Sequence, residues 1–141
     1  MQTGLVLRPI ALGAAVVAMA ACSQGFEPGV PLTGRWGGKD LMADLTPAGG
    51  TLELTCGAGE LDGPLVPDNN GHVTASGYTI FVGGAQPPVG YVAPRTRVVI
   101  SGRVDGAKLT LGVWKVLIIS TEASQQYTLV RGSNGQVLLC P

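Results

Sequence analysis

Few side chains in this sequence are of the types that carry out catalysis. His72 is the sole histidine, and it follows a turn at the start of an expected strand, where an exposed polar residue is common. Glycoside hydrolysis needs two carboxylates across a cleft, but Glu60 and Asp62 flank a turn and Glu53 alternates onto the outward face of its strand. The sequence also contains no G-x-S-x-G nucleophile motif. We therefore expect no catalytic residue and no enzymatic activity.

Metal and cofactor sites are as weakly indicated as catalytic ones. Gly57-Ala58-Gly59 is a lone G-x-G with no helical pattern after it, which is typical of a tight turn and not of a phosphate-binding loop. Cys56 and Cys140 are far apart in the chain, and with His72 alone in support they lack the spacing of a zinc site. We expect neither a metal nor a cofactor.

The arginines offer a candidate for anion binding. Arg95, Arg97 and Arg103 form a basic cluster, and the parity of Arg97 and Arg103 places both on one face of a strand. A solvated charged face is the simpler interpretation of such a pair. Tyr91, in the loop before them, is an amphipathic residue of a kind found at interfaces. Arg97, Arg103 and Tyr91 are therefore the candidate interaction surface.

The N-terminus has the features of a secretory signal. Arg8 supplies a positive charge, and residues 10–21 (IALGAAVVAMAA) are small or apolar. This run is too short to span a bilayer, which needs about 20 residues. The sequence predicts a signal peptide over residues 1–21 and no further segment that could span a membrane.

Two cleavage sites compete at the end of the signal. Ala18-Met19-Ala20 is an A-x-A site of a soluble secreted protein. Met19-Ala20-Ala21-Cys22 resembles the lipobox of bacterial lipoproteins, in which the cysteine is lipidated and becomes the first residue. The resemblance implies a lipid anchor at Cys22, followed by a flexible tether over residues 22–33, which contain two Pro and two Gly. We expect the protein in the cell envelope, on the periplasmic face or the cell surface, with a soluble secreted form as the alternative.

With Cys22 assigned to the lipid, two cysteines remain. Cys56 and Cys140 form an even pair in an exported protein, where disulfides persist. Their Cα atoms are expected within about 7 Å of each other. The bridge would close a loop of roughly 85 residues, worth about 4–5 kcal/mol in the chain-entropy model. Two free thiols are the alternative.

Hydrophobic residues alternate with period two along much of the chain after residue 40. Such alternation predicts strands with one buried face, and turn signals such as Asp105-Gly106 separate them, with a type I′ turn expected there. We predict an all-β fold over residues 34–141: a single antiparallel meander of about eight strands forming a small barrel, with a β-sandwich as the alternative. The longest expected loop covers residues 81–94. The alternating runs are 41–45, 52–56, 73–77, 98–104, 109–113 and 127–131.

Several fragments together resemble a family of small bacterial secreted proteins and lipoproteins. They include Trp36-Gly37-Gly38, the C-x-x-G-x-[IL]-D-G-P-L pattern over residues 56–65, and the terminal Cys140. The resemblance covers nearly all of residues 34–141 and implies that the two cysteines belong together. It implies no activity, substrate or catalytic residue. The uncharged, Pro-rich loop over 81–94 departs from the family.

A second, shorter resemblance concerns Gly34-Arg35-Trp36, which matches the G-x-W at the start of lipocalin and avidin barrels. In those barrels the Trp lies near the closed end, and an Arg from a late strand packs on it. The resemblance implies that Trp36 and Arg131 form a barrel-closing pair. The alternative is that Trp36 is an ordinary core residue.

Low charge and a missing catalytic motif favour a binding role. The chain has 9 Lys+Arg and 9 Asp+Glu, so it lacks the basic excess of a nucleic-acid-binding protein. We expect a monomeric, non-enzymatic envelope lipoprotein that contacts the membrane through its lipid and binds a protein, a glycan or a small ligand. The alternative is an inhibitor of a secreted or envelope hydrolase of the protease or lysozyme type, and an enzyme ranks third.

Overall fold

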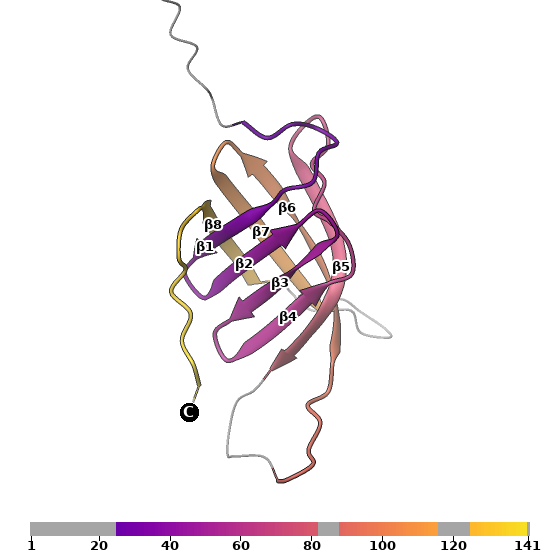
Figure 1. The fold of residues 1–141 in the computed structure, drawn as a ribbon, viewed down its shortest axis with the longest axis vertical. Coiled ribbons are helices and arrows are strands. Elements are labelled where there is room, and N and C mark those ends of the chain that lie inside the picture. The colour runs from indigo at the N-terminus through magenta and orange to yellow at the C-terminus, as the bar shows by residue number, and fades with distance from the viewer. Residues whose placement is uncertain (1–24, 82–87, 116–124, 141) are drawn as a thin grey trace, which may run out of the picture.

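The chain folds as a β-barrel. The computed structural model describes residues 25–81, 88–115 and 125–140, and among these residues there is no helix. The predicted all-β class is confirmed (Figure 1). The strands are β1 (Gly34–Gly38), β2 (Leu41–Thr46), β3 (Gly49–Leu54), β4 (Gly57–Leu61), β5 (His72–Phe81), β6 (Thr96–Asp105), β7 (Lys108–Lys115) and β8 (Gln125–Arg131).

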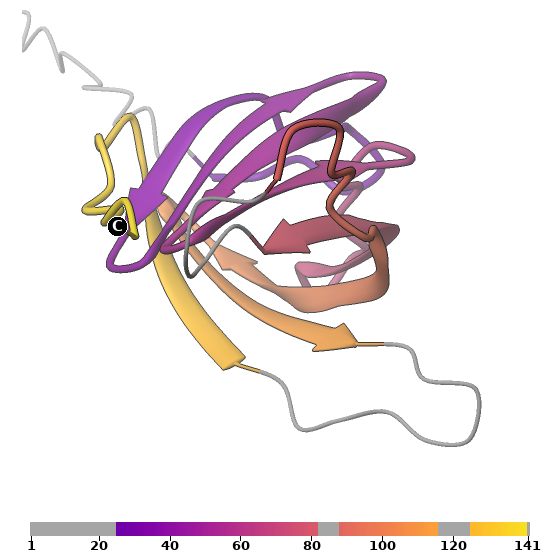
Figure 2. The same cartoon turned by 90° about the horizontal axis from the view of Figure 1, so that it is seen from below.

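Each strand pairs antiparallel with the next, and β8 returns to pair with β1. The predicted meander is therefore confirmed as a closed barrel, and the alternative of a sandwich is wrong. Figure 2 shows β1–β4 on one side of the barrel and β5–β8 curving round the other. In the closing pair, Trp36 lies opposite Arg131 and Gly38 lies opposite Leu129.

Alternation along the strands places apolar side chains inside the barrel. An eight-stranded barrel has an interior just wide enough for side chains to fill. The buried apolar residues form one cluster, which draws on all eight strands. Its largest fully buried side chains include Trp36, Leu41, Leu52, Ile100, Leu109, Leu111 and Leu129.

The hairpin predicted at Asp105-Gly106 is present, but its centre differs from the expectation. Asp105 pairs with Lys108, so the two central residues are Gly106 and Ala107. Only Gly106 has a positive φ, at 57°. A type I′ turn needs a positive φ at both central residues, so that expectation is wrong, and glycine at the first central position is typical of type II′.

The flexible tether predicted over residues 22–33 is not observed from Phe26 onward. Leu32 is buried in the core, and its backbone N–H donates to the carbonyl of Leu65 at 2.8 Å. Phe26 packs against the same core, and the N–H of Gly29 donates to Pro67. The prolines and glycines of this segment suggested a tether, but its few large apolar residues pack onto the end of the barrel where β1 begins. Residues 22–24, including Cys22, lie outside the described residues.

The C-terminal segment crosses the outside of β1 after β8 ends (Figure 1). The N–H of Gln136 donates to Gly38, and the N–H of Asp40 donates to Gln136, both at 2.9 Å. A Cβ added to Gly37 would lie 2.3 Å from the backbone nitrogen of Gly135. Glycine in β1 is therefore needed for the close approach of this segment.

Cys140, near the end of this segment, reaches the turn between β3 and β4. The Cα atoms of Cys56 and Cys140 are 4.8 Å apart, and the two side chains form a disulfide. The expected Cα separation is confirmed. The N–H of Cys56 also donates to the carbonyl of Leu138 at 3.2 Å, so this end of the chain is fixed to the barrel by both contacts.

The described residues contain no helix long and apolar enough to cross a bilayer. The predicted signal peptide over residues 1–21 lies outside them, as does the stretch 82–87 of the loop predicted over 81–94.

Candidate functional site

The outward side chains of β5–β8 form two rows that run across the four strands. Val73, Ile100 and Leu111 on these strands are buried in the core, so the residues that alternate with them face away from it. The strand register aligns the outward residues as His72–Arg103–Thr110–Thr128 in one row and Thr74–Ser101–Gly112–Gln126 in the next.

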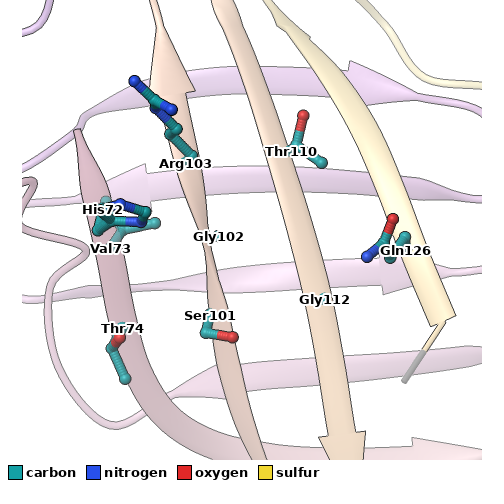
Figure 3. Close-up of a pocket in the computed structure, with 9 residues that line it drawn as sticks. All are labelled: His72, Val73, Thr74, Ser101, Gly102, Arg103, Thr110, Gly112 and Gln126. Carbon is teal, nitrogen blue, oxygen red and sulfur yellow. The ribbon is translucent and has the colours of Figure 1, made fainter. Parts of the chain in front are cut away.

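A groove of about 340 Å³ lies over these two rows (Figure 3). Its floor is low because Gly112 has no side chain and Ser101 is short. Figure 3 shows His72 and Arg103 near one end of the groove and Gln126 across from them on β8. The groove is therefore lined by hydroxyl, amide, imidazole and guanidinium groups on the outer face of the barrel.

Gly102 sets the shape of this part of the sheet. Its neighbours Ser101 and Arg103 face the groove. A Cβ added to Gly102 would lie 2.0 Å from the carbonyl oxygen of Thr110 on β7. Only glycine therefore allows β6 and β7 to approach this closely beneath the groove.

Arg103 differs from other arginines of the barrel strands in having no partner. Within the described part of the chain, it forms no ion pair or ring contact, and the nearby Asp105 on the same strand is not paired with it. Its guanidinium is therefore exposed in the groove and available to an anion. The partnered arginines are Arg35 with Asp44, Arg97 with Asp62, and Arg131 with the ring of Trp36.

Asp68 fixes the turn that leads into His72. Its Oδ1 accepts hydrogen bonds from the backbone N–H groups of Asn70 at 2.8 Å and of His72 at 2.9 Å. The hydrogen bond from the His72 N–H is the main reason that the pKa of Asp68 lies below its ordinary value. Ionised Asp68 thus anchors one end of the groove.

We expect the contribution of ionised Asp68 to the stability of the fold to depend on pH. Because the pKa of Asp68 is lower in the folded state, its stabilising effect is present above about pH 4 and is lost as the pH falls through the folded-state value. Thermal melts of the wild type and Asp68→Asn between pH 7 and pH 2 measure this. The difference in melting temperature between the wild type and Asp68→Asn should shrink toward low pH. A constant difference would contradict a stabilising role of the ionised carboxylate.

The candidate interaction surface of Arg97, Arg103 and Tyr91 is not a single site in the structure. Arg97 donates to the hydroxyl of Tyr78 at 2.7 Å and lies 3.2 Å from Asp62, so its guanidinium is already engaged. Arg97 and Arg103 share the outer face of β6, but they are six positions apart along the strand, which is roughly 20 Å. Tyr91 is exposed in the loop between β5 and β6 and does not line the groove.

Trp36 and Arg131 are brought together at the seam of the barrel. The guanidinium carbon of Arg131 lies 4.9 Å from the ring centroid of Trp36, which is fully buried. The Trp36 Nε1–H donates to the carbonyl of Thr33 at 3.2 Å. The pair therefore joins the first strand to the last.

The residues weighed for catalysis lie in different places. His72 lines the groove, whereas Glu60 lines a second outer hollow of about 160 Å³ with Tyr78 and Arg95. Asp62 is paired with Arg97. Across the described ranges, no three His, Cys, Asp or Glu side chains gather closely enough to hold a metal ion.

Of the residues that line the groove, only His72 and Arg103 stand out in the sequence as candidates for function. Thr74, Ser101 and Thr110 share an outward parity with these residues, and that signal is present in the sequence. Their assembly depends on which residues are opposite each other on neighbouring strands, and alternation within one strand does not give that register.

The fold and this site define a small antiparallel β-barrel with a packed interior and a polar groove on its outer face. No family model, no curated protein and no solved structure matches the chain. The resemblance to the bacterial family stays a prediction.

Proposed function

We propose that this protein is an exported, lipid-anchored and non-enzymatic binding module of the cell envelope. The observation that carries the proposal is the polar groove on the outer face of a barrel whose interior is packed with apolar side chains. Side chains on hydrogen-bonded strands are held more precisely than side chains on loops. A ligand in this groove would meet polar groups that are already in place, which reduces the entropy cost of binding.

The disulfide between Cys56 and Cys140 supports export, because disulfides persist in oxidising compartments and are rare in the cytosol. The lipobox-like residues 19–22 support an anchor at Cys22. Since Phe26 already packs on the barrel, the tether is limited to residues 22–25. Four extended residues span at most about 14 Å, so the barrel end that carries Phe26 would lie close to the membrane.

Replacement of Cys22 by alanine is expected to move the protein from the membrane fraction to the soluble fraction. A lipid chain contributes about 0.8 kcal/mol per buried methylene, and stable anchoring needs more than one chain. Fractionation of producing cells, followed by immunoblotting, measures the change. Thr51→Ala is the matched control, because it changes an exposed residue of β3 that the proposal does not assign to lipid. Wild-type distribution of the Cys22→Ala protein would contradict the anchor.

Site-specific photocrosslinking in cells tests the binding role. A photoreactive residue at Thr110 lies in the groove, whereas one at Thr51 lies on the outer face of β3, away from it. The proposal predicts an adduct at Thr110 that is missing at Thr51. Equal labelling at both positions, or no adduct at Thr110, would overturn it.

A second candidate, inhibition of a secreted or envelope hydrolase, is favoured by one observation. Apolar side chains stand exposed in the described part of the β5–β6 loop, with exposed fractions of 86% for Val92 and 56% for Tyr91. Exposed apolar loop residues are suited to insertion into an enzyme cleft. Lysozyme and protease assays with the wild type and a Tyr91→Ser, Val92→Ser variant test this candidate. Inhibition that the variant loses would support it, and full hydrolase activity with excess wild type would exclude it.

A further inference from the structure

The groove contains one unpaired cation surrounded by uncharged hydrogen-bonding groups. Arg103 supplies the charge, and the side chains of Thr74, Ser101, Thr110 and Gln126 supply hydroxyl and amide groups. Hydroxyls both donate and accept hydrogen bonds, and the amide also does both. Such a set is complementary to a ligand that carries several hydroxyl groups and one anionic group.

Peptides fit this site poorly. An extended peptide commonly binds by adding a strand to an exposed sheet edge, but every strand described here has a neighbour on both sides because the barrel is closed. Protein interfaces centre on buried aromatic or aliphatic anchors. The apolar lining residue Val73 belongs to the core, so its side chain offers no anchor pocket in the groove.

The size of the groove also limits its occupant. Its volume of about 340 Å³ lies at the lower end of the range for small-molecule sites. It extends across four neighbouring strands, which are spaced about 4.8 Å apart, so its length suits a short chain of rings. The open side of the groove allows the rest of a longer polymer to continue beyond it.

We propose that the groove over β5–β8 binds an acidic saccharide, with its carboxylate on Arg103 and its hydroxyl groups on the Thr, Ser and Gln side chains. The proposal rests on the proposed function and adds the class of ligand to it. A guanidinium can donate two parallel hydrogen bonds to a carboxylate. Arg103 therefore selects the acidic sugar, and the rows of hydroxyl groups orient its ring.

Calorimetric titration of the full protein, purified from membranes in detergent, tests the assignment. The probe is an oligosaccharide of uronic acid units, and the matched control ligand is the same oligosaccharide with its carboxylates reduced to hydroxymethyl groups. We expect the affinity for the acidic form to be at least about ten-fold higher than for the reduced form, because the reduced form lacks the hydrogen bond between the carboxylate and Arg103. Equal affinity, or no binding of the acidic form, would overturn the inference.

Two variants link the binding to the groove. Arg103→Gln is expected to remove the preference for the acidic form, and Arg95→Gln, at an exposed arginine in the other hollow, is expected to keep it. Gly112→Val raises the floor and is expected to abolish binding of both forms. A melting midpoint close to the wild-type value shows that each variant is folded. Retention of the preference by Arg103→Gln would refute the assignment of Arg103.

Two further ligands separate a saccharide from other anions. Inorganic phosphate and vesicles of anionic phospholipid without any sugar are expected to bind at least ten-fold more weakly than the acidic oligosaccharide. Binding of the vesicles in preference to the saccharide would overturn the inference in favour of a lipid surface. A crosslinked adduct at Thr110 in cells, together with no saccharide binding, would reject the ligand class and leave the binding role standing.

Discussion

Replacement of Trp36 by alanine is expected to lower the free energy of unfolding by about 3–5 kcal/mol. The side chain is fully buried in the barrel core, and the variant leaves a cavity that the surrounding strands cannot fill. It also removes the contact with Arg131, and a cation on a Trp face contributes about 0.5–2 kcal/mol. Because small domains are stable by only about 5–15 kcal/mol, this change removes much of the total.

Urea denaturation followed by circular dichroism measures the loss. Val130→Ala is the matched control, since Val130 neighbours Arg131 on β8 but is 46% exposed and faces outward. Arg131→Met should lower the free energy of unfolding by less than Trp36→Ala does, because the methionine side chain still packs on the Trp36 ring. A Trp36→Ala midpoint equal to that of the wild type would contradict the closing role of the pair.

Loss of the disulfide is expected to cost about 4–5 kcal/mol, because Cys56 and Cys140 are separated by 84 residues in the sequence and the chain-entropy term grows with loop length. Cys140→Ser removes the bond with little change in side-chain size. Beyond this global effect, the C-terminal segment loses its covalent attachment to the β3–β4 turn. The N–H of Gln136, bonded to Gly38 across β1, should then exchange with solvent faster.

Thermal melts with and without reductant measure the global effect, and hydrogen exchange measures the local one. Reduction should lower the wild-type melting temperature to that of Cys140→Ser. The Cys140→Ser protein serves as the control, and its melt should not respond to reductant. An unchanged wild-type melt under reducing conditions that break the bond would show that the disulfide has no structural role.

Alternation in the sequence was sufficient to predict most of the barrel but not all of its strands. The apolar residues of β6, such as Val98 and Ile100, alternate with polar ones and are buried as expected. In contrast, β1 is the sequence GRWGG, in which glycines interrupt any pattern. Gly37 is there because the C-terminal segment approaches its backbone closely, and that contact joins residues nearly one hundred positions apart. No local pattern encodes such a contact.

The same limit applies at both ends of the described chain. Phe26 and Leu32 sit among prolines and glycines, so composition suggested a tether, whereas the complementary apolar surface around Leu65 comes from a distant loop. The disulfide, in contrast, can be predicted without knowledge of the strand register. Once Cys22 is assigned to the lipid, Cys56 and Cys140 are the only cysteines that remain in the sequence.

The groove was predictable only in part for a related reason. Outward positions of single strands follow from parity, and parity alone predicts that Arg103 is exposed. Its lack of a partner and its place opposite His72 and Thr110 follow from the pairing of three strands. Arg97 had the same parity and the same charge, yet Asp62 and Tyr78 engage it. Sequence parity thus cannot distinguish a structural arginine from one that is available to a ligand.

Amide NMR titration of the full protein with the uronic acid oligosaccharide tests the central claim most directly, because it locates binding on the outside or the inside of the barrel. We expect the shifted amides to cluster on the groove rows, at Thr74, Ser101, Gly112 and Gln126. Amides beside interior residues such as Leu52 and Leu129 should keep their positions. Shifts confined to the residues around the core, with none along the groove, would contradict a barrel that binds through its outer face.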